Sequence, residues 1–451
     1  MTSVALPPEL REYDLSEMSF WTRPESHRQA AFGLMREMDG LAFVPIKKLP
    51  FTRSKPGFHA LARHADVIEA SRTAELFSSE PTTNTLTEMP AWAARFFGSM
   101  INMDDPRHAQ IRRVVSRAFS PRVLARVEED VQRRATRIVD EMIAEGPEDF
   151  VAQAAARLPV EVICDLMGIP DRYHGMVLRR TNEILGYSDP EYNGIKADER
   201  YFTGTPRRRD FLLGAGRLVR AGHDLFRLVK RLGEERRGTP GEDLISKLVN
   251  ANADGESLTA QETGSFFILL VTAGNETTRN AIAHALRLFT EFPEQRRLLM
   301  EDFDGRIAGA VEEVVRYATP VIQFRRNVTR DCELNGAPLK KGDIVVLIYT
   351  SANRDEAVFT DPHAFDILRS PNPHVGFGGP GPHYCMGAHL ARREITVMLR
   401  ELLTRLPDIR AEGESDRLIS HFINGIKRMP FAFTPPEDQD ETRDETQEGR
   451  S

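Results

Sequence analysis

Cysteine is scarce in this chain. Its 451 residues include only three, Cys164, Cys332 and Cys385, and no two of them form a CxxC pair. A disulfide framework therefore has no support, and we expect a reducing, cytoplasmic setting. An excess of positive charge is also absent, because the formal net charge is −7. The overall charge balance thus argues against a nucleic-acid partner.

Long apolar runs and targeting signals are missing as well. The N-terminal stretch MTSVALPPELREYDLSEM is polar and acidic, without the apolar core of a signal peptide. The most apolar run, FFILLV at 266–271, soon meets Gly274 and Glu276 and is too short to cross a bilayer. The sequence therefore predicts a soluble protein with no membrane anchor.

Most of the interior has the apolar spacing of helices. Residues 120–145 repeat apolar side chains at steps of three and four, and Ser120 precedes a proline in the manner of an N-cap. Residues 259–292 open with a capping box of Thr259 and Glu262 and end before a proline. We expect two long helices at these places.

Strand signals are fewer. The run DIVVLIY at 343–349 follows a Lys-Gly turn, and Asn424-Gly425 within 421–433 predicts a hairpin. No internal repeat or linker divides the chain, so we expect one large, mainly α domain with small β-sheets over residues 1–433. The remaining stretch, 434–451, is charged and almost free of apolar residues, which predicts a disordered acidic tail.

The stretch PNPHVGFGGPGPHYCMGAHLARRE, residues 371–394, places Cys385 behind a run of glycines and prolines and directly before a helix. Glycines such as Gly376, Gly379 and Gly381 let a backbone approach a flat ligand, and a helix N-terminus stabilises a thiolate. A thiolate can bind haem iron. From this loop alone, a haem ligand, a buried structural thiol and a nucleophile activated by His383 all remain open.

The pattern Gly381-x-His383-x-Cys385-x-Gly387, followed by AHLARRE, resembles the haem-binding loop of the cytochrome P450 superfamily. The resemblance implies the cytochrome P450 fold, haem b as cofactor and Cys385 as the ligand of its iron. Phe377, Gly378 and Gly387 would contact the haem. The loop is one residue longer than the usual pattern, because Gly378 stands where the family has an aromatic residue.

A second similarity lies inside the helix expected at 259–292. Its segment AGNETT resembles the oxygen-binding segment of the same family. Ala273 and Gly274 would lie beside the haem. Glu276 and Thr277 would supply the two protons that cleavage of dioxygen requires, as a carboxylate and hydroxyl joined through water.

Two further groups of residues match the family. Glu313 and Arg316 resemble its E-x-x-R pair, which implies a structural role in the scaffold below the haem. Four basic side chains stand at family positions suited to the haem propionates, namely His108, Arg112, Arg326 and His383. The last of these is thereby reassigned from an activating base to a propionate partner.

Several strings, among them FGSMINMDDPRH and FINGIKRMP, look closest to mycobacterial hydroxylases of methyl-branched lipids and sterol side chains. The resemblance implies hydroxylation at or near the end of a lipid-like chain. The apolar contacts should come from the distal side of the haem, with candidates Met100, Leu185, Leu270, Val321 and Phe422.

No flavin, nicotinamide or iron–sulfur motif is visible, so the electrons must come from a ferredoxin and its NAD(P)H-dependent reductase. A basic face could steer the acidic ferredoxin, with candidates Arg107, Arg112, Arg113, Arg117, Arg122, Arg392 and Arg393. Dioxygen and a small hydrophobic molecule complete the list of partners, and we expect a monomer.

Three alternatives stand beside this reading. One is a P450 that acts on another secondary metabolite, such as a terpenoid or polyketide. Another is a haem-thiolate sensor without turnover, against which the Glu276 and Thr277 pair argues. The third is an enzyme with a cysteine nucleophile and no haem, which a colourless protein with a reactive Cys385 would support.

Overall fold

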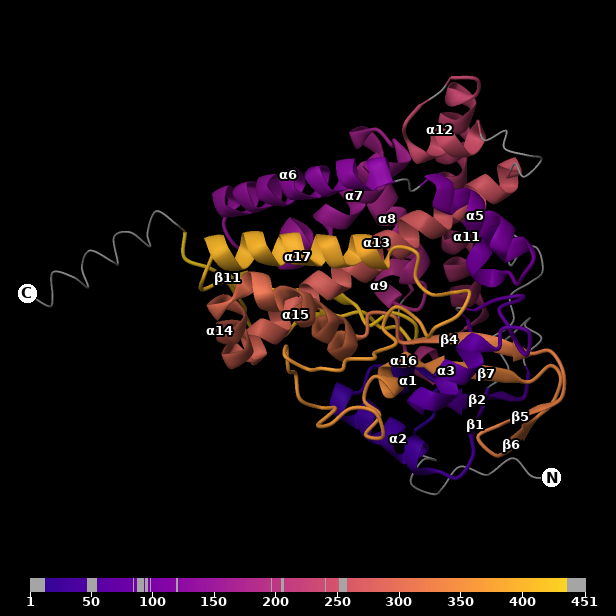
Figure 1. The fold of residues 1–451 in the computed structure, drawn as a ribbon. Helices are drawn as coiled ribbons and strands as arrows, with labels where there is room; N and C mark the ends of the chain where they lie inside the picture. Colours follow the sequence, from indigo (N-terminus) through magenta and orange to yellow (C-terminus); the bar gives the residue numbers. More distant parts are fainter. Residues whose placement is uncertain are drawn as a thin grey trace, which may run out of the picture.

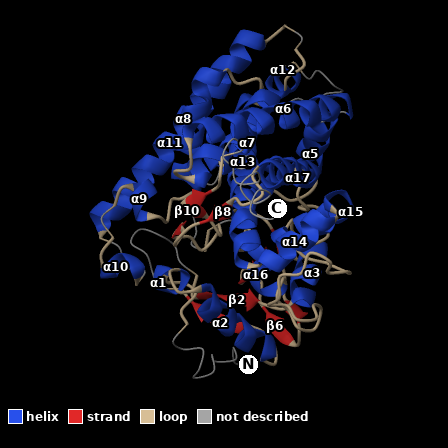
Figure 2. Cartoon of the chain, turned by 90° about the vertical axis from the view of Figure 1, so that its left-hand side faces the viewer, coloured by secondary structure: helices blue, strands red, loops and turns tan. Residues whose placement is uncertain are grey.

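A computed structural model describes residues 13–46, 55–83, 85–86, 93, 96–97, 99–118, 121–195, 197–203, 207–239, 241–250 and 258–435. The long helices are packed together at one end of the molecule and the main sheet lies at the other (Figures 1 and 2). The chain is mainly helical with small sheets, as expected. Most of the acidic tail predicted at 434–451 lies outside the described residues, although Thr434 still hydrogen-bonds to Asp408.

Helix α13 (Ala260–Glu291) runs through the centre of the helical part. Its N-terminus carries the predicted capping box: the Glu262 amide donates to Thr259 Oγ1 (3.2 Å) and the Thr259 amide donates to Glu262 Oε2 (2.9 Å). Both reciprocal bonds satisfy amides that a helix end leaves free. The helix stops at Phe292, and α14 begins at the following proline as expected.

Other helices surround α13. It packs against α7 (Arg157–Met167), α8 (His174–Leu185), α11 (Arg208–Arg236), α15 (Phe303–Ala318) and α17 (Ala388–Arg405). The predicted helix at 120–145 is confirmed as α6 (Pro121–Glu145), which packs against α7 and α17. Because α13 is buried on nearly all sides, it carries apolar residues around most of its circumference.

The remaining helices are shorter or lie at the periphery. They are α1 (Met18–Trp21), α2 (Glu25–Glu37), α3 (His64–Arg72), α5 (Arg107–Ala118), α9 (Pro190–Asn193), α10 (Glu199–Phe202), α12 (Leu244–Val249), α14 (Pro293–Glu301) and α16 (Tyr349–Ala352). Single turns of other helical types are η2 (Met100–Asn102), η3 (Val151–Ala155) and η4 (Asp171–Tyr173).

The main sheet has the strand order β1-β2-β7-β4-β3. These strands are β1 (Ala42–Pro45), β2 (Gly57–Leu61), β3 (Phe77–Ser78), β4 (Gln323–Val328) and β7 (Ile344–Ile348). The strand predicted at 343–349 is confirmed as β7. Its side chains alternate between two cores: Ile344 and Val346 pack with α1 and α2, while Val345 and Leu347 pack with α3. Burial on both faces explains why this strand is apolar throughout.

Three two-stranded sheets complete the fold. They pair β5 (Cys332–Leu334) with β6 (Ala337–Leu339), β8 (Arg410–Ala411) with β11 (Phe431–Ala432), and β9 (Asp416–Arg417) with β10 (Ile426–Arg428). The predicted hairpin turn at Asn424-Gly425 is wrong. The Asn424 amide instead donates to Pro320 O (2.9 Å), and the strands after this dipeptide pair with strands that precede it in the chain.

Candidate active site

The cysteine loop lies between the main sheet and the start of α17. The Cys385 amide donates to Phe377 O (3.0 Å), which closes the loop. Helix α17 begins at Ala388, directly after Gly387. Cys385 as a whole residue is exposed, although protein atoms surround its sulfur. Desolvation raises the pKa of Cys385, while backbone N–H groups of Gly387 and Ala388 and the charge of Arg112 act in the opposite direction. The helix end and Arg112 thus act in the direction that a thiolate ligand requires, and burial acts against it.

The glycines of this loop serve its packing against the protein. A Cβ on Gly381 would lie 2.1 Å from the carbonyl oxygen of Ser71 on α3, so only glycine allows this approach. Gly378 has φ of +89°, a conformation that favours glycine, and its amide donates to Val375 O (2.9 Å). The expected role of Gly381 beside a flat ligand is wrong, because its missing side chain faces α3.

Phe377 keeps a defined place despite the additional residue in the loop. Its ring packs under the guanidinium of Arg392, whose Cζ lies 4.3 Å from the ring centroid. Arg392 in turn forms an ion pair with Glu312 (2.5 Å). The Phe377 ring is thus held between the cysteine loop and Arg392 of α17.

Two buried or half-buried arginines lie near Cys385 without an acidic partner in the described residues. Arg326, on β4, is 5% exposed, and among the described residues its guanidinium donates only to Arg325 O (2.8 Å). Arg112, on α5, donates to Tyr384 O (2.8 Å). Desolvation lowers the pKa of both groups, which reflects a positive charge held away from water. Such a pair suits an anionic ligand edge.

The two predicted histidines lie together. The rings of His108 and His383 stack at 4.3 Å, and His383 Nε2 lies 2.9 Å from Ser79 Oγ. Burial, Arg326, His108 and Arg112 together lower the pKa of His383 to about 3, and burial also lowers that of His108. Arg112 and Arg326 thus hold the positive charge at this edge, and the two histidine rings lie together beside them. His108 Nε2 is buried and has no hydrogen-bond partner.

On α13, Ala273 and Thr277 are one turn apart and share an accessible face. Thr277 Oγ1 donates to the Ala273 carbonyl oxygen (2.7 Å). Gly274 points elsewhere, because a Cβ at that position would meet Ile163 Cδ1 on α7 at 3.3 Å. The small residue permits the close approach of α13 and α7.

Glu276 is turned into the protein. It is 1% exposed, and its Oε1 forms an ion pair with Arg279 and accepts from Asn280 Nδ2 (3.2 Å). Arg279 also donates to Asn182 Oδ1 (3.0 Å), whereas the second oxygen of Glu276, Oε2, is buried without a partner. Within the described residues the structure does not join Glu276 to Thr277 by a hydrogen bond.

Three of the five predicted substrate contacts gather in one apolar cluster. Leu185 from the end of α8 packs with Phe422, and Val321 lies against them beside its bridge to Ile423. The Phe422 ring contacts that of Phe324 at 5.3 Å. Phe324 also lies 5.9 Å from the guanidinium carbon of Arg326. The cluster is therefore continuous with the arginine edge described above.

The other two candidates lie apart from this cluster. Met100 is buried in the main helical core, and Leu270 is a half-buried residue of α13 packed against that core. A polar pair not foreseen from the sequence borders the cluster: Tyr187 Oη lies 3.0 Å from His421 Nε2. His421 directly precedes Phe422, and Tyr187 follows Leu185 by two residues. The two segments lie too far apart in the chain for residue spacing to predict their contact.

The E-x-x-R pair forms a closed network. Glu313 and Arg316 are fully buried, and Arg316 Nε and Nη2 each donate to the Glu313 carboxylate at 2.7 Å. The remaining guanidinium bonds go to the carbonyl oxygens of Asn353, Pro362 and Ala364 at 2.8–2.9 Å. This arrangement has the geometry that a structural role requires.

The predicted basic face is weaker than expected. Arg107 forms an ion pair with Glu262, and Arg392 forms one with Glu312, so neither presents a free charge. The side chains of Arg117 and Arg122 lie outside the described residues. Arg113 is exposed and Arg393 half-buried, and both lie on the two helices next to the cysteine loop.

These residues fit a haem. A thiol at a helix start, two arginines without acidic partners and the orphaned Nε2 of buried His108 offer one metal ligand and donors for an anionic edge. The cytochrome P450 family model matches residues 58–421.

The chain is a cytochrome P450.

Known proteins similar to this P450 cover most of its length. It is 44% identical over 433 residues to the methyl-branched lipid omega-hydroxylase of Mycobacterium tuberculosis, covering 95% of this chain and 96% of that protein. It is 38% identical over 386 residues to the steroid C26-monooxygenase of Mycolicibacterium smegmatis, with 84% of each chain covered. The structure of a Mycobacterium marinum cytochrome P450 in complex with pseudoionone aligns with a TM-score of 0.86 and 39% identity, over 93% of this chain and 98% of that one.

Family membership makes this P450 a haem-thiolate monooxygenase, an oxidoreductase that uses dioxygen on a lipophilic substrate. Among the described residues, none of the helices has the length and apolar character needed to cross a bilayer. None of the three cysteines forms a disulfide, as the sequence predicted.

Proposed function

We propose that this P450 hydroxylates a C–H bond at or near the end of a methyl-branched lipid, isoprenoid or sterol side chain. The identity of 44% to a methyl-branched lipid omega-hydroxylase carries this proposal, and the steroid relative supports it. The reaction consumes the substrate, dioxygen, two electrons and two protons, and yields the alcohol and water. The apolar cluster of Leu185, Val321 and Phe422 is suited to hold an alkyl chain by area buried.

The haem is haem b, with Cys385 as its iron ligand. When bound, it supplies the oxidising chemistry, because a thiolate ligand favours O–O cleavage. Arg112 and Arg326 would bind its propionates, since both hold buried or half-buried positive charge without an acid in the described residues. His108 and His383 would act as neutral N–H donors at the same edge. Glu313 and Arg316 would support the loop from below.

Thr277 and Glu276 have unequal parts in proton delivery. The Thr277 hydroxyl lies on the accessible face of α13 and can pass a proton by rotating away from the Ala273 carbonyl. In Glu276 the ion pair with Arg279 occupies one carboxylate oxygen. Its other oxygen, Oε2, has no partner and could accept a water from the interior. Arg279 and Asn182 then position the acid.

Electrons would come from a ferredoxin and its NAD(P)H-dependent reductase, to a monomeric, cytoplasmic P450. Arg107 and Arg392 pair with acids, so the docking face would carry less net positive charge than the count of its arginines suggests. Salt should therefore slow the first electron transfer only moderately.

The test combines spectra with product analysis. Purified protein should give the red-shifted thiolate band with carbon monoxide after reduction, and Cys385→Ala should abolish it. Branched fatty acids, sterols and pseudoionone are then titrated for a shift of the Soret band. With a surrogate ferredoxin system, the best ligand should yield a terminal alcohol. A product oxidised only at internal carbons would contradict the proposed regiochemistry.

Variants on α13 test the proton path. Thr277→Ala should raise the consumption of reductant per product severalfold, whereas Thr277→Ser, which keeps the hydroxyl, should stay near the wild type. Equal coupling in all three proteins would remove Thr277 from proton delivery without affecting the substrate assignment.

A further inference from the structure

Glu312 directly precedes Glu313 of the E-x-x-R pair on α15, but its carboxylate binds a different part of the chain. One oxygen, Oε1, accepts from Arg392 Nε (2.5 Å), and the other, Oε2, accepts from Arg392 Nη2 (2.9 Å). Oε2 also lies 2.9 Å from Nε2 of His374. His374 comes before Cys385 in the chain and Arg392 comes after it. One carboxylate thus binds the chain on both sides of the cysteine loop.

The segment that enters the cysteine loop divides its side chains between the two adjacent acids of α15. Asn372 Nδ2 donates to Glu313 Oε2 (3.1 Å), and His374, two residues later, meets Glu312. Glu313 is fully buried and belongs to the closed network of Arg316, whereas the Glu312 side chain is 29% exposed. Because Arg316 is fully hydrogen-bonded without Glu312, the Glu312 carboxylate is left to bind the loop.

His374 joins Glu312 to the backbone of the loop. Its side chain is 3% exposed, and its Nδ1 accepts from the Gly376 amide (3.1 Å). Because Nδ1 accepts this bond, the ring proton lies on Nε2, which donates to Glu312. Gly376 lies against α15, where a Cβ would come within 2.6 Å of Val315 Cγ1. The histidine therefore ties the entering segment to α15 at a point of close backbone approach.

Arg392 completes the connection from the other side of the loop. Its Cζ lies 4.3 Å from the centroid of the Phe377 ring, and the His374 ring lies 5.9 Å from the same ring, centroid to centroid. The Phe377 carbonyl oxygen accepts from the Cys385 amide (3.0 Å). Glu312, His374, Phe377 and Arg392 therefore form a closed set of contacts with one hydrogen bond to the thiol-bearing residue. We refer to these four residues as the Glu312 network.

The Glu312 network has an ionised carboxylate at its centre. Burial would raise the pKa of Glu312, but the hydrogen bonds from Arg392 and His374 lower it to about 2. The carboxylate is therefore charged at neutral pH. Hydrogen bonds to a charged acceptor are roughly twice as strong as those between neutral groups. Removal of this one charge should weaken the contacts on both sides of the loop together.

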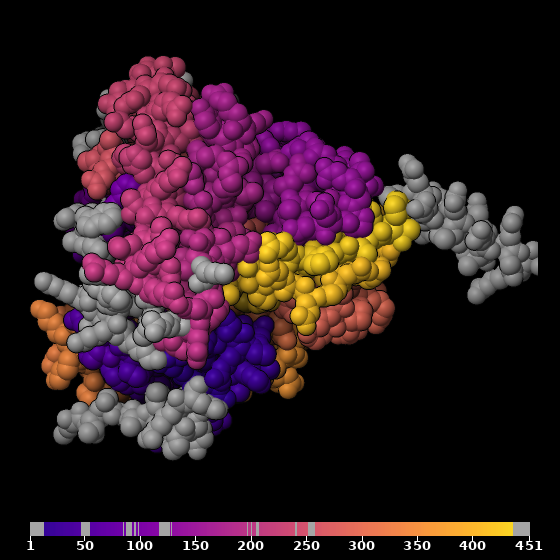
Figure 3. Space-filling model, turned by 180° about the vertical axis from the view of Figure 1, so that it is seen from behind, coloured from indigo at the N-terminus to yellow at the C-terminus, as the bar shows by residue number. Residues whose placement is uncertain are grey.

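Glu312 and Arg392 stand on two helices that the core holds in place. Helices α15 and α17 lie side by side (Figure 1). Helix α17 also packs on α6, and from behind the yellow C-terminal part of the chain lies between α6, in purple, and the salmon-coloured residues near position 300 (Figure 3). A loop bonded to side chains on two packed helices takes its position from rigid elements.

We propose that Glu312 is a positioning residue for the thiolate: through His374 and Arg392 it fixes both sides of the cysteine loop and thereby the place of the Cys385 sulfur. This inference rests on the proposed function, in which Cys385 is the iron ligand. Glu312 acts only through the side chains that it binds. Without its charge the loop should move, and the sulfur should be lost more readily as a thiolate ligand.

The thiolate band of the reduced holoenzyme with carbon monoxide tests the proposal. Its decay to the unshifted band is followed over time at one elevated temperature. Glu312→Gln keeps the size of the side chain and one acceptor oxygen but removes the charge, so the decay should be about tenfold faster than in the wild type. The matched control is Glu183→Gln, because Glu183 is 24% exposed and pairs with Arg180 on α8 (2.7 Å). The control should decay like the wild type.

Two variants of His374 separate its two hydrogen bonds. His374→Gln places an amide nitrogen near the position of Nε2 and keeps the bond to Glu312. His374→Asn places an amide oxygen near the position of Nδ1, keeps the bond to the Gly376 amide and does not reach Glu312. The asparagine variant should therefore lose the thiolate band faster than the glutamine variant. The opposite order would assign the effect to the Gly376 turn and overturn the proposal.

Failure of this inference is distinct from failure of the proposed function. A wild type without the thiolate band would refute the proposed function, and the role of Glu312 with it. Equal decay in the wild type, Glu312→Gln and Glu183→Gln would refute the role of Glu312 alone. A greater loss of urea stability in haem-free Glu312→Gln than in haem-free Glu183→Gln would show a scaffold role and also overturn the proposal. The comparison of the two His374 variants decides the question even where Glu312→Gln fails to fold.

Discussion

Arg316 and Arg326 are both buried arginines, one on α15 and the other on the strand that follows it, yet their surroundings differ. The guanidinium of Arg316 meets both oxygens of Glu313 and three backbone carbonyls. That of Arg326 makes a single hydrogen bond, to a neighbouring carbonyl oxygen. A buried charge that the protein satisfies completely is part of its scaffold. A buried charge left with one bond is prepared for a ligand that brings the missing anion.

The largest expected effect is at Arg316, whose guanidinium is fully hydrogen-bonded by the protein. Arg316→Lys keeps the charge but cannot form five directed hydrogen bonds, so the Glu313 carboxylate and several carbonyl oxygens lose donors. We expect the free energy of unfolding to fall by about 3–5 kcal/mol, measured by urea denaturation. Arg297→Lys, in an exposed pair with Glu301, is the control and should cost less than about 1 kcal/mol. A loss as small as the control's would erase the contrast.

A substitution of Arg326 should weaken haem binding but should not destabilise the haem-free protein. Arg326→Gln should speed loss of haem to a scavenging apoglobin by about tenfold, because a charge-assisted contact to a propionate is removed. The haem-free protein should unfold at the same or a higher urea concentration than the wild type. Destabilisation of both forms would show that Arg326 is scaffold, like Arg316.

Asp66 on α3 is an intermediate case. Burial, opposed by Arg63 and reinforced by Asp355, raises the pKa of Asp66 to about 6. The Arg63 guanidinium donates to Arg36 O, Asn335 Oδ1 and Met38 O rather than to Asp66.

A folded-state pKa above the unfolded value of 3.8 means that stability is full below about pH 4 and is lost as pH rises through 6. Asp66→Asn should therefore stabilise the protein at pH 7 by about 1–3 kcal/mol and have no effect near pH 4. Urea unfolding at both pH values measures this, and an effect independent of pH would refute the shifted pKa.

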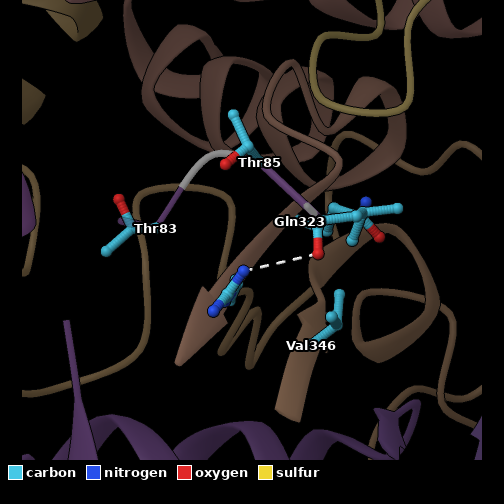
Figure 4. Close-up of a pocket in the computed structure, with 6 residues that line it drawn as sticks. Thr83, Thr85, Gln323 and Val346 are labelled. Carbon is cyan, nitrogen blue, oxygen red and sulfur yellow. Dashed lines mark hydrogen bonds between the residues drawn. The ribbon is translucent and has the colours of Figure 1, made fainter. Parts of the chain in front are cut away.

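The smallest expected effect concerns a neutral group. Gln323 lines a small cavity with Thr83, Thr85, Leu86, Arg325 and Val346 (Figure 4), and neither of its buried amide atoms has a hydrogen-bond partner. Gln323→Met keeps the length of the side chain and removes the cost of burying the amide, so stability should rise by about 1 kcal/mol. Thermal unfolding would show this, and a decrease would mean that the amide is satisfied in solution.

What the sequence could predict was local. The capping box of Thr259 and Glu262 and the end of α13 depend on residues close in the chain, and both are confirmed. The hairpin at Asn424-Gly425 failed because strand pairing depends on partners that precede the turn by many residues. The neutral state of His383 also could not be foreseen, since it results from burial beside Arg326 and Arg112.

Side-chain direction was the other limit. The sequence placed Glu276 and Thr277 next to each other, but neighbours on a helix point about 100° apart. Arg279, the ion-pair partner of Glu276, stands three residues later and could have been inferred from that spacing. Gly274 and Gly381 were recognised as special positions, but only the fold shows that their missing side chains face Ile163 and Ser71.

Glu262 takes part in two structures at once. Its carboxylate caps α13, the helix of Thr277, and also pairs with Arg107 at the first position of α5, the helix of His108 and Arg112. The Glu262 carboxylate thus joins the start of α13 to the start of α5. A shift of either helix along its axis would strain this ion pair. The pair therefore helps to fix the distance between Thr277 on α13 and the propionate partners on α5.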